Sequence, residues 1–374
     1  MKDSTAIAYL VGARPNFVKM APLIAEMRER APGLEHVLIN TGQHYDRELA
    51  GTFVDELQIT APDHELAVGS GSHGAQTGKA LERIESVLDG LRPALFVVAG
   101  DVNSTLAGAL AAAKLDIPIA HLEAGLRSFD RTMPEEINRV LTDQLSTWCL
   151  THSPEAEENL LREGVSAERI HFVGNTMIDT LVRMRPAIDS SPVLDQLGLA
   201  AKQYLLVTLH RPSLVDGDGF GEVLAALARL ADWAPVVFPV HPRTRARLDA
   251  DADAAAHPAL QLMEPVGYVD FLALETGARG VITDSGGVQE ETTFLGVPCF
   301  TMRAGTERPV TVSHGTNRII GTDPAALAEI PELLVGWSAP PTDLPGWDGH
   351  ASERAARVLL AGLDQPVSAQ AGGG

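Results

Sequence analysis

The feature that most constrains the fold is a regular alternation of two kinds of segment along the whole chain. Short runs rich in apolar and β-branched residues, such as AIAYLVG and ALFVVAG, are separated by amphipathic stretches of helix length. This alternation is typical of βαβ units, which form mainly parallel sheets. Strands are expected at 6–12, 36–40, 94–100, 117–121, 147–152, 169–174, 204–210, 236–241, 259–263, 280–284 and 297–302. Helices are expected at 73–90, 103–115, 134–147, 221–232 and 286–295.

The chain has 374 residues, which is longer than a domain with a single hydrophobic core usually is. A stretch rich in proline and serine, RPAIDSSPVLDQLG, interrupts the pattern near 184–200. We therefore predict an α/β fold of two doubly wound, Rossmann-like domains that face each other across a cleft. The expected domains are 1–185 and 200–350. A last helix at 351–364 is expected to pack back on the first domain, and 365–374 to form a disordered tail.

Net charge and cysteine content indicate which binding partners and which cellular compartment to expect. The formal net charge is −20, whereas nucleic acids and anionic membranes attract basic surfaces, so neither partner is expected. The two cysteines, Cys149 and Cys299, form no metal-ligand spacing and no disulfide framework, which suits a reducing cytosol. The sequence has no signal-peptide pattern and no apolar run long enough to span a bilayer. We expect a cytoplasmic protein without a metal site.

The segment 134–147 illustrates the helical periodicity. Pro134 suits the first turn of a helix. Ile137, Val140, Leu141 and Leu145 fall on one face at helical spacing, which favours a helix here.

Unusual polar clusters follow the predicted strands in both halves of the chain. They read GARPNFVK, GDVNST and HLEAGLRS in the first half, and TLHRPS, PVHPRTR and TDSGGVQEE in the second. Ligands of open parallel sheets bind outside the carboxyl ends of the strands. Six such clusters predict a binding cleft.

The cluster DSGGVQEE has the composition of an anion site. Ser285, Gly286 and Gly287 lie between a predicted strand and a predicted helix, where free N–H groups and the helix dipole attract anions. A tight turn with an N-cap and no ligand would look the same. Further positive charge comes from Arg14, Lys19, Arg211, Arg243 and Arg308.

The sequence lacks the loops that bind common nucleotide cofactors. No GxGxxG follows the first strand, and no GxxxxGK[ST] occurs. We expect no cofactor, and the basic residues predict a site for a diphosphate.

Carboxylates follow neighbouring strands of the first half. Asp101 and Glu123 each follow a predicted buried strand, and Glu135 and Glu136 open a predicted helix. Each alone is often a cap or a loop contact. Together they offer an acid and a base for proton transfer at carbon, because clustered carboxylates acquire different pKa values. His210 and His241 could titrate or donate to a phosphate.

The motifs GARPNFVKMAPL, TGQHYD, GDVNST, HLEAGLRS, PEEINR, TLHRPS, YVDFLAL, DSGGVQEE and TERP, in this order, closely resemble the non-hydrolysing UDP-N-acetylglucosamine 2-epimerases from about residue 5 to 322. The resemblance implies a GT-B-like fold, a homodimer and a UDP-sugar substrate. It also implies interconversion of UDP-N-acetylglucosamine (UDP-GlcNAc) and UDP-N-acetylmannosamine (UDP-ManNAc), in which UDP is eliminated to a 2-acetamidoglucal and added back.

The resemblance assigns roles by motif. It implies that Asp101, Glu123 and Glu135 are the acid–base groups and that His210 lies beside the diphosphate. Arg14 and Lys19 match basic residues near the phosphates, and Ser285, Gly286 and Gly287 match the phosphate-binding turn. Glu291 matches the residue that holds the ribose hydroxyls, and Phe271 the residue that packs on uracil. Which carboxylate serves which face of C2 stays open.

Three departures from the family pattern bear on function. The first motif reads GARPN where many members have GTRPE. Gln43 matches a contact to an activating second UDP-GlcNAc, but Ala75 stands where those members have arginine, which puts this regulation in doubt. The stretch RSFDRTMPEE is shorter than in many members and could alter the sugar pocket.

Several alternatives remain open from the sequence. A retaining glycosyltransferase shares the fold and the glutamate that grips ribose, but needs no such set of carboxylates. A hydrolysing epimerase would release free sugar. A related epimerase acting on a 2,3-diacetamido uronic acid sugar would need an extra cation for the substrate carboxylate. A module that only binds would tolerate loss of Asp101, Glu123 and Glu135.

Overall fold

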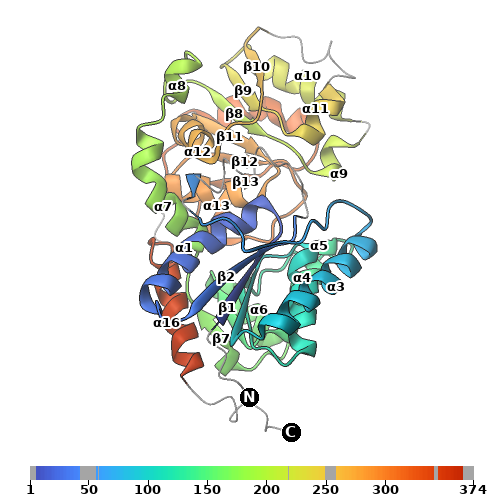
Figure 1. Ribbon diagram of the computed structural model, residues 1–374. Helices are drawn as coiled ribbons and strands as arrows, with labels where there is room; N and C mark the ends of the chain where they lie inside the picture. Colours follow the sequence, from blue (N-terminus) through green and yellow to red (C-terminus); the bar gives the residue numbers. More distant parts are fainter. Residues whose placement is uncertain are drawn as a thin grey trace. The chain divides into compact units, whose positions relative to one another are not determined.

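The computed structural model describes residues 6–42, 56–57, 59–217, 219–248, 258–340 and 344–364. The chain forms two compact units. Unit 1 runs to Val182 and resumes at Pro345, and unit 2 comprises Arg183–Leu344. Each unit is an α/β domain with a parallel sheet, so the predicted fold class is confirmed (Figure 1). The tail 365–374 and Gln43 lie outside the described residues.

Unit 1 has a seven-stranded parallel sheet in the order β3-β2-β1-β4-β5-β6-β7. Its strands are β1 (Ala6–Val11), β2 (Glu35–Asn40), β3 (His64–Glu65), β4 (Leu95–Ala99), β5 (Ile119–Ala124), β6 (Trp148–Thr151) and β7 (Ile170–Phe172). Its helices are α1 (Arg14–Arg30), α3 (His73–Leu91), α4 (Asn103–Lys114), α5 (Pro134–Leu145), α6 (Pro154–Arg162), the 3₁₀ helix η1 (Ala167–Arg169) and α16 (Ala351–Leu363).

Helix α7 (Thr176–Asp189) leads from unit 1 into unit 2, which has a six-stranded parallel sheet in the order β10-β9-β8-β11-β12-β13. Its strands are β8 (Leu205–Thr208), β9 (Val236–Pro239), β10 (Leu260–Met263), β11 (Gly280–Thr283), β12 (Cys299–Thr301) and β13 (Asn317–Ile319). Its helices are α8 (Val193–Gln196), α9 (Pro212–Val215), α10 (Phe220–Leu230), α11 (Pro242–Leu248), α12 (Tyr268–Gly277), α13 (Gly286–Leu295), α14 (Val310–Ser313), η2 (Pro324–Glu329) and α15 (Ile330–Leu334).

All eleven expected strand segments contain a strand, and all five expected helices form. Strands β3 and β13 were not predicted, because two or three residues show no periodicity. The interruption expected at 184–200 begins late: α7 continues through Pro186 to Asp189.

Close packing of α4 sets the position of the strand ends in unit 1. Helix α4 is rich in alanine, and Ala107, Ala111 and Ala112 belong to the core that it shares with α3 and the sheet. A Cβ at Gly108 would lie 2.4 Å from Cδ2 of Leu10 in β1. A larger residue could not be accommodated without moving the helix away from the sheet.

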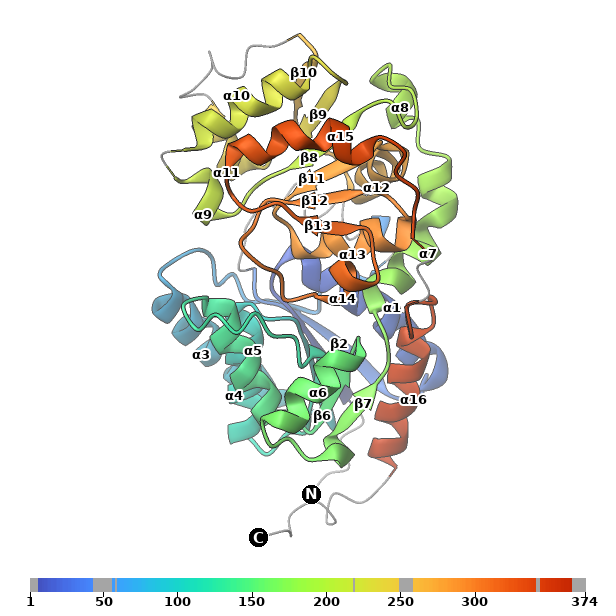
Figure 2. The same ribbon diagram turned by 180° about the vertical axis from the view of Figure 1, so that it is seen from behind.

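The last helix, α16, packs against α1 of unit 1, and both views show the two helices side by side (Figures 1 and 2). Its first N–H groups, those of Ala351 and Ser352, donate to the carboxylate of Asp179 on α7 at 3.0 and 2.6 Å. The side chain of Arg354 donates to the carbonyl of Val173 at 2.6 Å. These bonds satisfy the helix N-terminus and attach the returning segment to unit 1.

The predicted helix at 134–147 forms as α5, and its apolar face is only partly covered. Leu145 packs against the core of unit 1, whereas Ile137 and Leu141 are 41% and 46% exposed. The buried residues of α5 are polar, Arg139 and Asp143 among them. The reason is that these polar side chains form ion pairs with groups at the ends of the strands, as described below.

Among the described residues, no helix has both the length and the apolar character needed to cross a membrane.

Candidate functional site

In unit 1 the predicted site residues gather at the carboxyl ends of adjacent strands. Glu123 is the fifth residue of β5, and its carboxylate forms an ion pair with the ammonium of Lys19 on α1. Asn16, on the same helix, donates to the carbonyl of Ala99 at the end of β4 at 2.9 Å. Because β1, β4 and β5 are neighbours, these contacts bring α1 and both strand ends together.

Glu123 is held in an unusual backbone conformation. Its φ is 72°, in the left-handed region that residues other than glycine rarely adopt. Such a conformation costs roughly 1–3 kcal/mol and is often found at functional sites. The backbone on either side is fixed by buried groups: Asp143 accepts from Gly125 N at 3.2 Å, and the ring of His121 lies 2.6 Å from Asp143 and 2.8 Å from the carbonyl of Gly100.

Asp101 is fixed by helix α5. Its carboxylate forms an ion pair with Arg139, and its carbonyl accepts from the side chain of Asn138 at 2.9 Å. Its side chain is partly exposed. The polar side of α5 therefore orients a predicted acid–base group.

The neighbouring glutamates Glu135 and Glu136 have different environments. Glu136 is buried and accepts from Ser128 N, Ser128 Oγ and Phe129 N at 2.9 Å each, and pairs with Arg139 at 2.5 Å. Burial raises the pKa of Glu136, but these hydrogen bonds and Arg139 outweigh burial and lower it. Glu136 is thus a structural carboxylate. Glu135 is half-buried and makes no hydrogen bond or ion pair within the described part of the chain, so it is available for chemistry.

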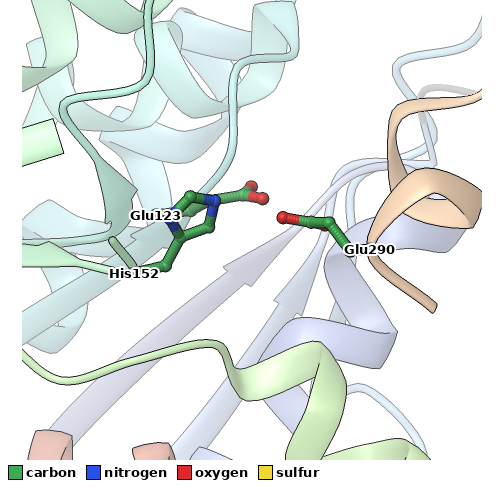
Figure 3. Close-up of side chains that lie close together, drawn as sticks. All are labelled: Glu123, His152 and Glu290. Atoms are coloured by element: carbon green, nitrogen blue, oxygen red, sulfur yellow. The ribbon is translucent and has the colours of Figure 1, made fainter. Parts of the chain in front are cut away.

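One residue near the predicted site was not among the residues predicted from the sequence. His152 follows β6, the strand next to β5, and a ring nitrogen lies within 4.8 Å of a carboxylate oxygen of Glu123 (Figure 3). Strand adjacency places these two residues together, since β5 and β6 are neighbours in the sheet. The signal that could have found His152 is its place at the end of a predicted strand, where Asp101 and Glu123 also lie close to strand ends.

In unit 2, Asp284 organises the ends of β8 and β11. Its carboxylate accepts from His210 N at 2.8 Å and Arg211 N at 2.7 Å and lies 2.9 Å from His210 Nδ1. Burial raises the pKa of Asp284, but the contacts with His210 outweigh it and lower the pKa. With Nδ1 bonded to Asp284, His210 presents Nε2 as its second polar atom. The ring of His241 lies 5.6 Å from that of His210.

The predicted anion site forms the start of α13. Ser285 is the N-cap residue and Gly286 the first helical residue. Arg308 lies against this turn: a Cβ on Gly286 would be 2.4 Å from Nη1 of Arg308. The guanidinium is oriented by Glu290 at 3.1 Å and Glu307 at 2.5 Å. Free N–H groups, the helix dipole and an oriented guanidinium make a site suited to a phosphate.

Helices α12 and α13 carry the predicted nucleoside-binding residues. Glu291 accepts a hydrogen bond from the hydroxyl of Tyr268 at 2.8 Å. Phe271 stands three residues after Tyr268, on the same face of α12, and is half-buried. A second acid, Glu275, is fully buried, and neither of its oxygens has a partner among the described residues. Burial and the neighbouring Glu291 raise the pKa of Glu275 well above its usual range.

The structure thus gathers Lys19, Asp101 and Glu123 in unit 1. In unit 2, His210 contacts Asp284, and Ser285, Gly286 and Gly287 follow Asp284 in the turn that begins α13. Arg14 is exposed at the first position of α1, and the side chain of Arg243 lies outside the described part of the chain.

The family model for UDP-N-acetylglucosamine 2-epimerase matches residues 26–360, nearly all of the described chain. The chain belongs to the UDP-N-acetylglucosamine 2-epimerase family. It is 44% identical over 329 residues to a UDP-N-acetylglucosamine 2-epimerase homolog of Methanococcus maripaludis, covering 86% of this chain and 90% of that protein.

Other members extend the comparison. A UDP-2,3-diacetamido-2,3-dideoxy-D-glucuronate 2-epimerase of Pseudomonas aeruginosa is 38% identical over 358 residues, covering 94% of this chain and 99% of that protein. The crystal structure of Methanocaldococcus jannaschii UDP-GlcNAc 2-epimerase in complex with UDP-GlcNAc and UDP has a TM-score of 0.89 at 38% identity, covering 95% of this chain and 99% of that one. The UDP-N-acetylglucosamine 2-epimerase family is an isomerase family, and this chain has its two-domain fold.

Proposed function

We propose that this protein interconverts UDP-GlcNAc and UDP-ManNAc without hydrolysis. The observation that carries the proposal is the pair of carboxylates with contrasting environments in unit 1: Glu123 is paired with Lys19, whereas Glu135 has no ion pair or hydrogen bond among the described residues. Proton transfer at one carbon from two sides needs two acid–base groups that are held differently. Membership of the family and the likeness to a UDP-GlcNAc complex support the same substrate class.

The proposed reaction proceeds through elimination and addition. A carboxylate takes the proton from C2, the C2–H electrons form the C1=C2 bond of a 2-acetamidoglucal, and the C1–O bond breaks to release UDP. UDP then adds back to C1 while a second acid delivers a proton to the opposite face of C2. Asp101, Glu123 and Glu135 are the proposed acid–base groups, with His210 beside the diphosphate. Atoms and charge balance without a redox cofactor or a metal ion.

The proposed nucleotide site combines charge and stacking. Ser285, Gly286 and Gly287 form the turn that holds a phosphate, with the N–H groups of the two glycines as donors. Arg14 and Lys19 add positive charge, Glu291 accepts from ribose hydroxyls and Phe271 packs on uracil. The support comes from the turn at the start of α13 with its oriented Arg308, and from the Tyr268–Glu291 hydrogen bond on the neighbouring helices. Tyr268 would hold the Glu291 carboxylate ready for the hydroxyls.

Proton NMR of UDP-GlcNAc with the purified protein in D2O tests this function. We expect UDP-ManNAc to appear and deuterium to enter C2, because the C2 proton exchanges during each reaction. UDP alone should bind in calorimetry. If the protein binds UDP but gives neither exchange nor a new epimer, the proposed reaction is wrong; release of free ManNAc would point to a hydrolysing enzyme.

A second candidate substrate is a UDP-2,3-diacetamido uronic acid. It is favoured by the 38% identity to the P. aeruginosa enzyme, which is named as a 2-epimerase of such a sugar. The proton chemistry at C2 would be the same. Presenting both sugars at equal concentration and comparing kcat/KM from the growth of the two C2 epimers separates the candidates.

We further propose that the protein is a homodimer that buries the outward side of α5. Ile137 and Leu141 on α5 and Phe129 just before it are 41%, 46% and 68% exposed. An apolar strip on a helix whose other side is polar is common at subunit interfaces. A second copy of the chain supplies an identical strip, as a two-fold interface requires.

We also propose a cytoplasmic location. Both cysteines are free and buried, and burial raises the pKa of both thiols to about 12. Protonated, inaccessible thiols suit a compartment where thiols stay reduced.

A further inference from the structure

The proposed reaction, on which this inference rests, leaves the enzyme altered after every turnover. One group removes a proton from C2 on one face, and another gives a proton to the opposite face. When the product leaves, the first group is protonated and the second is not, the reverse of the starting state. Before the next turnover in the same direction, each must exchange its proton with solvent. This reset is needed whichever role Glu123 has.

Glu123 has a titratable neighbour suited to this exchange. A ring nitrogen of His152 lies within 4.8 Å of its carboxylate, a separation that one water or a small side-chain rotation spans (Figure 3). Glu123 also forms an ion pair with the ammonium of Lys19. Lys19 stabilises the negative charge, whereas an imidazole can both accept and release a proton near neutral pH.

The imidazole is held in place from the returning segment of unit 1. Trp347 packs against the ring of His152 edge-on, with ring centroids 6.1 Å apart, and its indole N–H donates to the carbonyl of His152 at 3.2 Å. Trp347 is itself buried. His152 is also buried, and a segment 195 residues away in sequence thus packs against its ring.

We propose that His152 is the proton relay that resets Glu123 between turnovers. When Glu123 ends a turnover protonated, its O–H bond breaks, the proton forms an N–H bond with His152, and the imidazolium gives a proton to water. The sum is Glu–COOH plus water giving Glu–COO⁻ and H3O⁺. In the reverse direction of epimerisation the same steps run backwards. His152 acts through Glu123 and is therefore a positioning residue, not a catalytic one.

The test compares the first turnover with later ones in His152→Gln. With enzyme in excess over UDP-GlcNAc, we expect UDP-ManNAc to form at a rate close to the wild-type rate. With substrate in excess, a burst of about one equivalent should be followed by turnover slowed about tenfold or more, because general acid–base groups typically contribute 10²–10⁴-fold. KM for UDP-GlcNAc should stay within about twofold.

Two further variants sharpen the comparison. Imidazole added to His152→Ala should restore the later turnovers, since a free base can carry the proton from the emptied site. His350→Gln, the same substitution at an exposed histidine outside the site, should behave as wild type in both regimes. If His152→Gln does not fold, as judged by UDP binding, His152→Asn takes its place.

The proposal is overturned if first and later turnovers slow equally, if neither slows, or if imidazole has no effect on His152→Ala. A wild-type protein that makes no UDP-ManNAc at all would refute the proposed function instead, so the two failures are distinguishable.

Discussion

At the scale of single residues, the two adjacent glutamates at the start of α5 differ in their contacts. Glu136 is bonded within the fold, and Glu135 is a proposed acid–base group. The sequence PEEINR indicates two carboxylates near a helix N-terminus but not which of them is bonded. The structure separates them: the loop 126–133 folds back so that Ser128 and Phe129 donate to Glu136, while Glu135 has no partner in the part of the chain that the structure describes. Motif similarity favoured Glu135, and the contacts give the physical reason for that choice.

We expect Glu136→Gln to lower the free energy of unfolding by roughly 1–3 kcal/mol at pH 7, because an amide cannot satisfy all the donors that face Glu136. The folded-state pKa is lowered, so the carboxylate stabilises the fold above its unfolded pKa and this stability is lost as pH falls through the folded pKa. Chemical denaturation of both proteins between about pH 3 and 7 should show the difference shrinking toward acid.

Glu135→Gln is the matched control, since it changes the neighbouring residue in the same way. Without a bonded partner, it should alter stability by less than about 0.5 kcal/mol, yet lower kcat by about 10²-fold or more if Glu135 transfers a proton. Equal stability losses in the two variants would contradict this division of roles.

A second prediction at this scale concerns Gly286. Its replacement by alanine would put a Cβ 2.4 Å from Nη1 of Arg308, which Glu290 and Glu307 hold in place. We expect UDP affinity to fall by roughly 5- to 30-fold, equivalent to about 1–2 kcal/mol of overpacking. Calorimetric titration with UDP measures the affinity of both proteins.

Gly78→Ala on α3, where nothing lies within 4 Å of the added Cβ, is the control. It should leave UDP affinity unchanged. Unchanged affinity in Gly286→Ala as well would mean that UDP does not approach this turn.

At the scale of elements, α5 shows that apolar periodicity predicts a helix but does not by itself predict which side is buried. The spacing of Ile137, Val140, Leu141 and Leu145 correctly indicated a helix, yet Ile137 and Leu141 are exposed. The inward side is occupied by Arg139 and Asp143, which bond to groups on the strands. Hydrophobic periodicity cannot anticipate ion pairs between segments distant in sequence, and these pairs decide which side of α5 is buried.

The outward strip of α5 gives a prediction for assembly. Leu141→Glu should convert the proposed dimer to a monomer, because a buried charge without a partner at an interface costs several kcal/mol. Sedimentation velocity measures the change, and the unfolding midpoint of the isolated subunit should fall little, since Leu141 is already 46% exposed there. Leu161→Glu, at an exposed leucine on α6, is the matched control. A protein that sediments as a monomer before mutation would refute the interface.

At the scale of the whole molecule, the alternation of strand and helix was sufficient to predict both parallel sheets. The order of strands follows from short right-handed crossovers, which leave few alternatives for consecutive βαβ units. The pairings that complete the site, such as Lys19 with Glu123 and Arg139 with Asp101, join residues far apart in sequence, and the pattern carries no information about them. His152 was missed for the same reason.

The return of the chain to unit 1 has a consequence for synthesis. Unit 2 is contiguous and is complete once residue 344 has left the ribosome, whereas unit 1 still lacks Trp347 and α16. Because domains fold as units during translation, the domain that starts the chain is the last to finish. A polypeptide arrested between residues 344 and 351 would carry a finished second domain beside a first domain that leaves the Asp179 carboxylate without the helix that it caps.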